Sequence, residues 1–472
     1  MIINLVDNRR YFLRDEDNKV DEGIFKISQS SFKILINLLK TIANPLTTKD
    51  LDGVDFIERK YDKEDETLVL KAVTKNGKTY IQTGNMIGEF YFKSEQTTDQ
   101  INIGLRFDKD WKILDKKNKE IEHNTILEYL LNYANAVYPN KVKLKPIKSN
   151  KKKSNSIIKL LLSKMFSNSI SKAFVMGLPT HYQEFNESGY NVRGKIDINR
   201  LVSKELPFKG ITPYTRNEKI IEQNIGAILL KAIEIIEREY MPINVLSSIK
   251  STLKQAGIKP IVIPTTIQKA FRSRVLRNAI FSEYKNSLNL AIMIINGFQT
   301  PDFKNINGVF YGYLTDISKI WENYLVKLLR TNISDEWEIK AEPELKLFKD
   351  PPKLYEFTNV MYPDIVLKHK TNNKVIVFDA KFKQSSWFNR EDFYKTATYI
   401  SYYQNQNPKY DVILGGQIYP DKAYNGSDLG FLNSNVDFRF MGIDLKECKD
   451  TNIIKFREQC FIDNIKDITN QT

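Results

Sequence analysis

The sequence contains few of the residues that build disulfide scaffolds, zinc sites or histidine-dependent hydrolases. Only two cysteines, Cys448 and Cys460, and three histidines, His123, His181 and His369, occur in 472 residues. Two cysteines are too few for a disulfide framework or a zinc cluster. Because the histidines are scattered along the chain, a histidine-based metal site and a Ser/His triad are both disfavoured.

Two further absences concern membranes and nucleotides. No run approaches the roughly 18 apolar residues that a membrane span requires, and the start of the chain has no signal-peptide pattern. We therefore expect a cytoplasmic protein without a membrane partner. No Gly-x-x-x-x-Gly-Lys-Ser/Thr loop occurs to hold the phosphates of a nucleotide. Any dependence on GTP or ATP must come from another chain.

The chain carries an excess of positive charge. Its 71 basic and 57 acidic residues give a formal net charge of +14. Such an excess attracts polyanions and speeds association with them, which favours nucleic acid, here double-stranded DNA, as a partner. The alternative is a basic protein whose Lys-rich and Asn-rich composition reflects an AT-rich genome.

The hydrophobic pattern divides the chain into three regions. Residues 1–150 have a mixed α/β pattern, residues 151–300 are mainly helical, and residues 301–472 are again mixed. In the first region, strands are predicted at 11–13, 67–73, 87–92 and 101–107, and helices at 32–43 and 124–137. In the second region, helical periodicity covers 157–174, 220–240, 243–256 and 283–295.

The most informative stretch lies in the third region. A run containing Pro363-Asp364 and a run ending in Asp379-Ala380-Lys381 are rich in β-branched and aromatic residues, and the polar segment 370–374 between them is turn-like, so a β-hairpin is predicted. Because side chains alternate along a strand, Asp379 and Lys381 point to the same face. Strand pairing can bring Asp364 to that face as well.

This residue set suits metal-dependent cleavage of a phosphodiester. Two converging carboxylates repel each other unless a divalent cation lies between them, and oxygen ligands suit Mg²⁺ or Mn²⁺. Lys381 could position or deprotonate the attacking water and stabilise charge on the phosphate. Glu322, on a predicted helix at 320–330, could be a further metal or water ligand. In the alternative interpretation, the aspartates form turns and the lysine is a solvated edge residue.

These residues resemble the PD…(D/E)xK nuclease superfamily. The likeness lies in their order: an acidic helix, the two motif strands, a helix at about 391–404 and a strand at 412–419. The resemblance implies a sheet flanked by helices on both sides. Many relatives carry Gln-x-x-x-Tyr on the following helix, and the corresponding positions here are Lys395 and Tyr399. The lysine could contact phosphate in place of the glutamine.

A wider resemblance spans about residues 75–420. The segments that carry it are 81–88, 126–134, 177–179, 191–200, 207–210, 213–218 and 316–329. Together they are similar to McrC-type proteins, the nuclease subunits of McrBC-like restriction systems. The resemblance implies a McrB-like AAA+ GTPase ring as partner, a docking role for residues 1–150 and a cutting role for residues 301–472. The expected fold is therefore an α+β multidomain protein with a helical middle and a C-terminal restriction-endonuclease-like α/β/α domain.

Basic residues in the middle region are candidates for contacts with DNA. Arg193 and Lys195 could contact phosphate while Asp197 holds one of them in place, although a buried Arg–Asp pair fits the same residues. Arg272 and Arg274 belong to a basic strip that is either a phosphate contact or a solvated helix face.

Two classes of function remain open. The first is a Mg²⁺-dependent DNA endonuclease subunit of a restriction or phage-defence complex, and the second is a non-catalytic adaptor that binds DNA and activates an NTPase. A stand-alone structure-specific nuclease is a third possibility. His369, in the hairpin turn, is either a phosphate contact or a structural residue.

Overall fold

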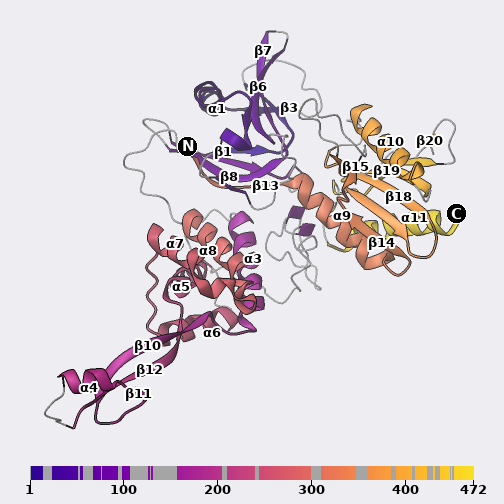
Figure 1. Cartoon of the computed structure of the whole chain (residues 1–472). Helices are drawn as coiled ribbons and strands as arrows, with labels where there is room; N and C mark the ends of the chain where they lie inside the picture. The colour runs from indigo at the N-terminus through magenta and orange to yellow at the C-terminus, as the bar shows by residue number, and fades with distance from the viewer. Residues whose placement is uncertain are drawn as a thin grey trace, which may run out of the picture. The chain divides into compact units, whose positions relative to one another are not determined.

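The computed structural model describes most of the chain (Figure 1). The described residues are 2–13, 24–50, 54–56, 67–75, 77–93, 98–106, 126–127, 129–130, 157–204, 210–239, 244–298, 310–346, 360–383, 390–406, 410–421, 429–430, 436–446, 448 and 451–471. They fall into two compact units, one made of Met1–Pro139 with Lys304–Thr472 and the other of Asn140–Phe303. The predicted helix at 124–137 lies almost wholly outside the described residues.

The first unit begins with two five-stranded sheets. One has the order β1 (Ile2–Val6), β9 (Thr98–Gly104), β8 (Met86–Lys93), β13 (Phe310–Asp316) and β5 (Val54–Phe56). The other has the order β3 (Ile24–Ile27), β2 (Arg10–Leu13), β7 (Lys78–Thr83), β6 (Leu68–Lys75) and β4 (Leu46–Thr47). Helix α1 (Gln29–Thr41) packs on β6, β2 and β7, and η1 (Thr48–Asp50) follows β4. The predicted mixture of strands and helices is therefore present.

Strand β13 joins distant parts of the chain. It pairs with β8 in antiparallel and with β5 in parallel orientation, although more than 200 residues separate it from either strand. Asp316 ends the strand and also caps the next helix, because its side chain accepts a hydrogen bond from the backbone N–H of Ser318 at 2.9 Å. The first sheet thus runs directly into the C-terminal part of the same unit.

The C-terminal part is a six-stranded sheet with helices on both faces. The strand order is β14 (Trp337–Ala341), β17 (Ile365–His369), β18 (Lys374–Ala380), β19 (Asp411–Tyr419), β21 (Asp437–Gly442) and β20 (Leu429–Gly430). Helix α10 (Arg390–Gln404) packs on β18 and β19, α9 (Ile317–Ile333) contacts β14 and β18, and α11 (Thr451–Gln471) contacts α9 (Figure 1). Strands β15 (Leu345–Lys346) and β16 (Val360–Met361) form a separate pair.

The predicted hairpin is present in this sheet. Strands β17 and β18 are antiparallel, with Ile365 opposite Phe378 and Val366 opposite Val377. Val366 and Val377 belong to the hydrophobic cluster that also contains Tyr399 and other residues of α10. Because side chains alternate along a strand, Asp379 has the same orientation as Val377 and lies on the face that α10 covers.

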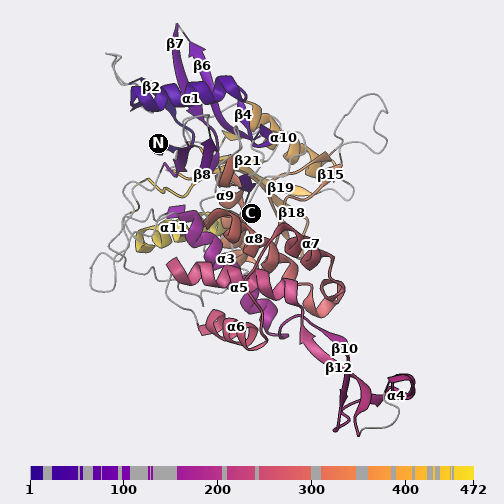
Figure 2. The same ribbon diagram turned by 90° about the vertical axis from the view of Figure 1, so that its left-hand side faces the viewer.

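The second unit consists of a helical body and a long hairpin. Its helices are α3 (Ile157–Phe174), α4 (Ile198–Lys204), α5 (Gln223–Glu239), α6 (Asn244–Gln255), α7 (Pro264–Arg272), η3 (Arg274–Arg277), η4 (Ala279–Phe281) and α8 (Tyr284–Phe298). Strands β10 (Thr180–Gly189) and β12 (Thr212–Ile221) pair along ten residues, and β11 (Lys195–Ile196) adds to β12. Figure 2 shows the hairpin extending from the helices of this unit, with α4 near its far end. The prediction of a mainly helical region is correct for the body but omits this hairpin.

No helix among the described residues is long and apolar enough to cross a membrane. The mixed α/β architecture with several sheets agrees with the expected α+β class. The domain boundaries predicted at residues 150 and 300 stay a prediction. In the structure, Met1–Pro139 and Lys304–Thr472 belong to one compact unit.

Candidate functional site

Two aspartates meet where β17 begins and β18 ends. Asp364 directly precedes β17, Asp379 is the penultimate residue of β18, and each is 3% exposed. Oδ2 of Asp364 accepts a hydrogen bond from the backbone N–H of Ala380 at 2.8 Å, which fixes this carboxylate against the end of β18. The strand pairing therefore brings together the two acids that the sequence placed on one face.

The two carboxylates perturb each other. Burial, followed by the negative charge of Asp364, raises the pKa of Asp379 from 3.8 to about 7, although Lys381 acts in the opposite direction. At neutral pH the pair therefore holds a proton for part of the time. A site that carries more negative charge than its lysine can neutralise is suited to binding a cation.

Lys381 lies beside these acids. Its Nζ is 2.7 Å from Oδ2 of Asp379 and 3.4 Å from Oδ1 of Asp392. Burial alone would lower the pKa of Lys381, but the charges of Asp379, Asp364 and Asp392 outweigh burial and raise it. Lys381 is therefore a positively charged ammonium at neutral pH. Its backbone N–H donates to the carbonyl of Ile418 on β19 at 2.9 Å.

Asp392 is a neighbour that the sequence analysis missed. It lies in the first turn of α10 and pairs with Lys383 as well as Lys381. Burial tends to raise the pKa of Asp392, but the two lysines together lower it, so the side chain is ionised. The available signal was helical spacing, because Asp392, Thr396 and Tyr399 recur on one face of the predicted helix.

A buried polar network continues from the site along β19. Gln417 is opposite Asp379 in the parallel pairing of β18 and β19 and is fully buried. Its Nε2 donates to Oγ1 of Thr396 at 3.3 Å, and its Oε1 accepts from the hydroxyl of Tyr419 at 2.6 Å. Sequence reasoning missed this network, because the only hint was a glutamine within an otherwise apolar strand.

Glu322 is placed differently from the two aspartates. It lies on α9, is 2% exposed, and its Oε2 is 3.4 Å from Nζ of Lys319. The same Nζ is 2.7 Å from Oε2 of Glu342, whose backbone N–H donates to the carbonyl of Asp364 at 3.1 Å. Across the described part of the chain, no group of three acidic, histidine or cysteine side chains forms a preassembled metal site. A metal-binding role for Glu322 stays a prediction.

The two candidates on α10 differ in burial. Lys395 is exposed, whereas Tyr399 is buried and its hydroxyl donates to the carbonyl of Tyr362 at 3.3 Å. Tyr399 thus holds the segment that leads into Asp364. The buried polar position on this helix is Thr396, next to Lys395, and the glutamine that Thr396 contacts comes from β19.

The other candidates lie at the far end of β17 or on exposed positions of the second unit. His369 is at the opposite end of β17 from Asp364, where its Nδ1 accepts from the backbone N–H of Thr371 at 3.3 Å. This arrangement supports the structural interpretation of His369. In the second unit, Arg272 and Arg274 are exposed at the end of α7 and in η3.

Residues near the tip of the β10–β12 hairpin do not form the buried Arg–Asp pair that the sequence analysis considered. Arg193 and Lys195 are both exposed. Asp197 instead accepts a hydrogen bond from the backbone N–H of Arg200 at 3.1 Å, at the start of α4. Phosphate contacts by Arg193 and Lys195 stay a prediction.

One family model and two solved structures match this chain. The family model described as McrBC 5-methylcytosine restriction system component matches residues 81–420. Among curated proteins, none matches the chain. A refined half-complex from the tetradecameric assembly of Thermococcus gammatolerans McrB AAA+ hexamers with bound McrC contains a chain with 16% identity and a TM-score of 0.53, and the match covers 98% of this chain and 100% of that one. The two chains therefore share a fold.

A second solved structure from the same organism also matches. It is the cryo-EM structure of the Thermococcus gammatolerans McrBC complex, with 17% identity, a TM-score of 0.37, and coverage of 71% of this chain and 88% of that one.

Proposed function

The chain belongs to the McrBC 5-methylcytosine restriction system component family, and from that premise we propose that it is the DNA-cutting, McrC-type subunit of such a system. The observation that carries the proposal is the convergence of Asp364, Asp379 and Lys381 at the joined ends of β17 and β18. Their order along the chain and the helices on both faces of the sheet support a place in the PD…(D/E)xK superfamily. The proposed reaction is hydrolysis of a phosphodiester bond in double-stranded DNA.

The residues present fit a divalent cation. Asp364 and Asp379 would hold Mg²⁺ or Mn²⁺ through carboxylate oxygens. Burial and, after it, the charge of Asp364 raise the pKa of Asp379, and a bound cation would offset both effects. Mg²⁺ usually keeps several water ligands, so two protein carboxylates are sufficient. When bound, the cation would polarise the phosphate and make its bound water more acidic.

Lys381 supplies a fixed positive charge. Because the neighbouring carboxylates outweigh burial and raise its pKa, its side chain is a positively charged ammonium group in the metal-free protein. We assign it to orienting the attacked phosphate and stabilising the negative charge that develops there. Asp392 would hold the ammonium group together with Asp379.

An AAA+ partner is part of the proposal. The sequence has no nucleotide-binding loop of its own, and the related structure contains McrB AAA+ hexamers with bound McrC. We propose that this chain works with a partner of that kind, which would hydrolyse GTP or ATP and which this chain would stimulate. The net charge of +14 supports direct contact with DNA, for which Arg193, Lys195, Arg272, Arg274 and Lys395 are the exposed candidates.

The test is cleavage of methylated and unmethylated plasmid with Mg²⁺, with and without the AAA+ partner and GTP or ATP. The wild-type chain is compared with Asp379→Ala and with Asp411→Ala, an exposed aspartate at the start of β19 in the same sheet. We expect cutting by the wild type and Asp411→Ala only when the partner is present, and none by Asp379→Ala.

Three other outcomes would contradict the proposal. Equal cutting by Asp379→Ala would remove the catalytic assignment. Full cutting by the chain alone would indicate a stand-alone nuclease. Stimulation of the partner's NTP hydrolysis without any DNA cutting would indicate a non-catalytic adaptor.

A further inference from the structure

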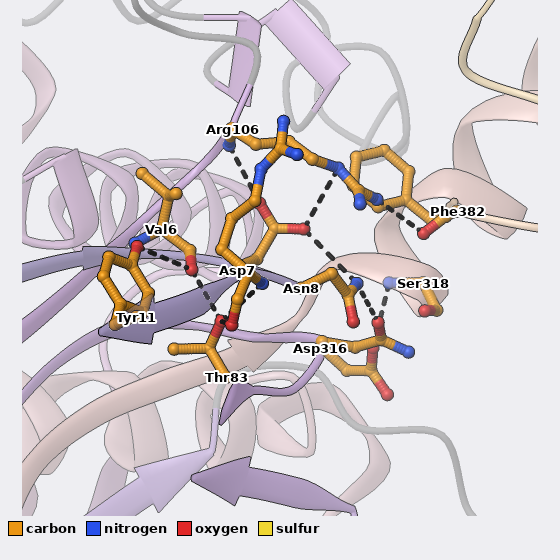
Figure 3. A network of polar contacts seen from close by, with 11 residues as sticks. Val6, Asp7, Asn8, Tyr11, Thr83, Arg106, Asp316, Ser318 and Phe382 are labelled. Atoms are coloured by element: carbon orange, nitrogen blue, oxygen red, sulfur yellow. Dashed lines mark hydrogen bonds and ion pairs between the residues drawn. The ribbon is translucent and has the colours of Figure 1, made fainter. Parts of the chain in front are cut away.

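Arg106 connects the five-stranded sheet that contains β9, called the N-terminal sheet below, to the segment that carries Lys381. It lies just beyond β9, and its Nη2 donates to the backbone carbonyl of Phe382 at 2.8 Å, across 276 residues of sequence. Its guanidinium group also lies over the ring of Phe382, 5.1 Å from the ring centroid. Figure 3 shows the Arg106 side chain reaching between Asp7 and Phe382.

Asp7 anchors this arginine at two points. Its Oδ1 accepts from the backbone N–H of Arg106 at 2.8 Å, and its Oδ2 is 3.5 Å from Nε of the same residue. The side chains of Asp7 and Arg106 are 0% and 1% exposed. Burial raises the pKa of Asp7 and lowers the pKa of Arg106, and each charge partly offsets the effect on the other. Two buried opposite charges with defined hydrogen bonds have little freedom to move.

The segment that Arg106 contacts follows directly on the end of strand β18. Strand β18 ends at Ala380, so Lys381 and Phe382 lie beyond the regular ladder. The backbone N–H of Lys381 donates to the carbonyl of Ile418, and the next carbonyl, that of Phe382, accepts from Arg106. The ring of Phe382 is 4% exposed and meets Trp321 of α9 edge-on, with 6.0 Å between centroids. Arg106 therefore restrains both the backbone and the side chain of the residue that follows Lys381.

We propose that Arg106, held by Asp7, is a positioning residue that keeps Lys381 against Asp379. The N-terminal sheet then determines the geometry of the cutting site without contributing a group that touches DNA phosphate. This inference rests on the proposed nuclease function for its kinetic consequence. The structural consequence, a fixed Lys381 backbone, can be measured whether or not the chain cuts DNA.

The test uses the full chain and a double variant, Asp7→Asn with Arg106→Met. The asparagine still provides an oxygen for the backbone N–H of residue 106, and both buried charges are removed together, so neither is left unpaired. The methionine can still pack on the ring of Phe382 but cannot donate to its carbonyl. The matched control is Tyr11→Phe, which removes a hydroxyl of a buried side chain that bonds to the backbone of Val6, the residue before Asp7.

The first measurement is amide hydrogen exchange in peptides spanning residues 378–383, without DNA or metal. We expect faster exchange at Lys381 in the double variant and no change in Tyr11→Phe. The second measurement is steady-state cleavage with the partner present. Because a misplaced catalytic group affects the chemical step, we expect kcat to fall about tenfold to 100-fold while KM for DNA changes less than about twofold.

Each outcome separates the two proposals. A folded double variant with unchanged exchange at residues 378–383 overturns the positioning role, whatever its activity. Faster exchange with unchanged kcat overturns it as well, because the position of Lys381 would then not control the reaction. If the wild type itself fails to cut, the nuclease proposal fails, and the exchange data still decide whether Arg106 fixes the Lys381 segment.

Discussion

Replacing Asp379 with asparagine should make the metal-free protein more stable while it abolishes cutting. The carboxylate is buried beside Asp364, which raises its pKa from 3.8 to about 7. An acid whose pKa is raised on folding binds more protons in the native state than in the unfolded state, so stability falls as pH rises through this window. Asparagine has nearly the same shape as a protonated aspartate and carries no charge.

The magnitude follows from the pKa difference. One pKa unit corresponds to about 1.4 kcal/mol, so the interval from 3.8 to about 7 corresponds to about 4 kcal/mol at about pH 8. The advantage of Asp379→Asn should be absent near pH 4 and should grow by about 1.4 kcal/mol per pH unit until it levels off above about pH 7. Lys381 keeps Asp392 as a partner in the variant.

The assay is urea unfolding of wild type and variant across this pH range in the presence of EDTA. The control is Asp411→Asn, an exposed position in the same sheet, where we expect a change within about 0.5 kcal/mol at every pH. Equal or lower stability of Asp379→Asn at about pH 8, or a difference that does not depend on pH, would refute the conclusion that burial and the neighbouring Asp364 make an ionised Asp379 unfavourable in the folded protein.

Four further predictions follow from the same site. Mg²⁺ binding at about pH 6 should release protons from the wild type but not from Asp379→Asn. The release is measured by calorimetry in buffers of different ionisation enthalpy. Equal release by both proteins would show that the released proton is not bound to Asp379. Lys381→Met should lower single-turnover cleavage about 100-fold or more, and a smaller loss would remove its charge-stabilising role. Gln417→Leu should lower the free energy of unfolding by about 1–3 kcal/mol, because the hydroxyls of Thr396 and Tyr419 lose their hydrogen bonds to the Gln417 side chain. An unchanged midpoint of urea unfolding would contradict this expectation. Gly416→Ala should destabilise the protein more than Gly415→Ala, by about 1–3 kcal/mol. A Cβ at position 416 would lie 2.5 Å from the backbone oxygen of Arg439, whereas the atom nearest to a Cβ at position 415 is the end of the flexible Ile400 side chain. The reverse order of stability in urea unfolding would contradict this packing.

The motif hairpin was predictable because its information is local. Runs rich in β-branched and aromatic residues, a polar turn and the spacing of Asp379 and Lys381 indicate two paired strands with the acids on one face. The helical body of the second unit was predictable for a similar reason, and α3 has the predicted bounds of 157–174. Periodicity within a segment was sufficient in both cases.

Contacts between distant segments could not be predicted in this way. Asp392 and Gln417 approach Asp379 and Lys381 only after α10 and β19 pack against β18. The hairpin of β10 and β12 was missed because β10 has no buried residue and the sequences of both strands show little alternation of apolar and polar residues. The contact between Arg106 and Phe382 depends on two segments 276 residues apart, and no local pattern in either one indicates the other.

Strand β13 has a consequence for how the gene can be divided. Since β13 lies between β8 and β5, a fragment that ends before residue 310 lacks an interior strand of its first sheet, and a fragment that begins there carries that strand without its partners. Asn140–Phe303 thus stands as an insertion within a single folded unit. Two separately expressed fragments, 1–139 and 304–472, should associate and fold together by complementation, because β13 of the second fragment pairs with β8 and β5 of the first.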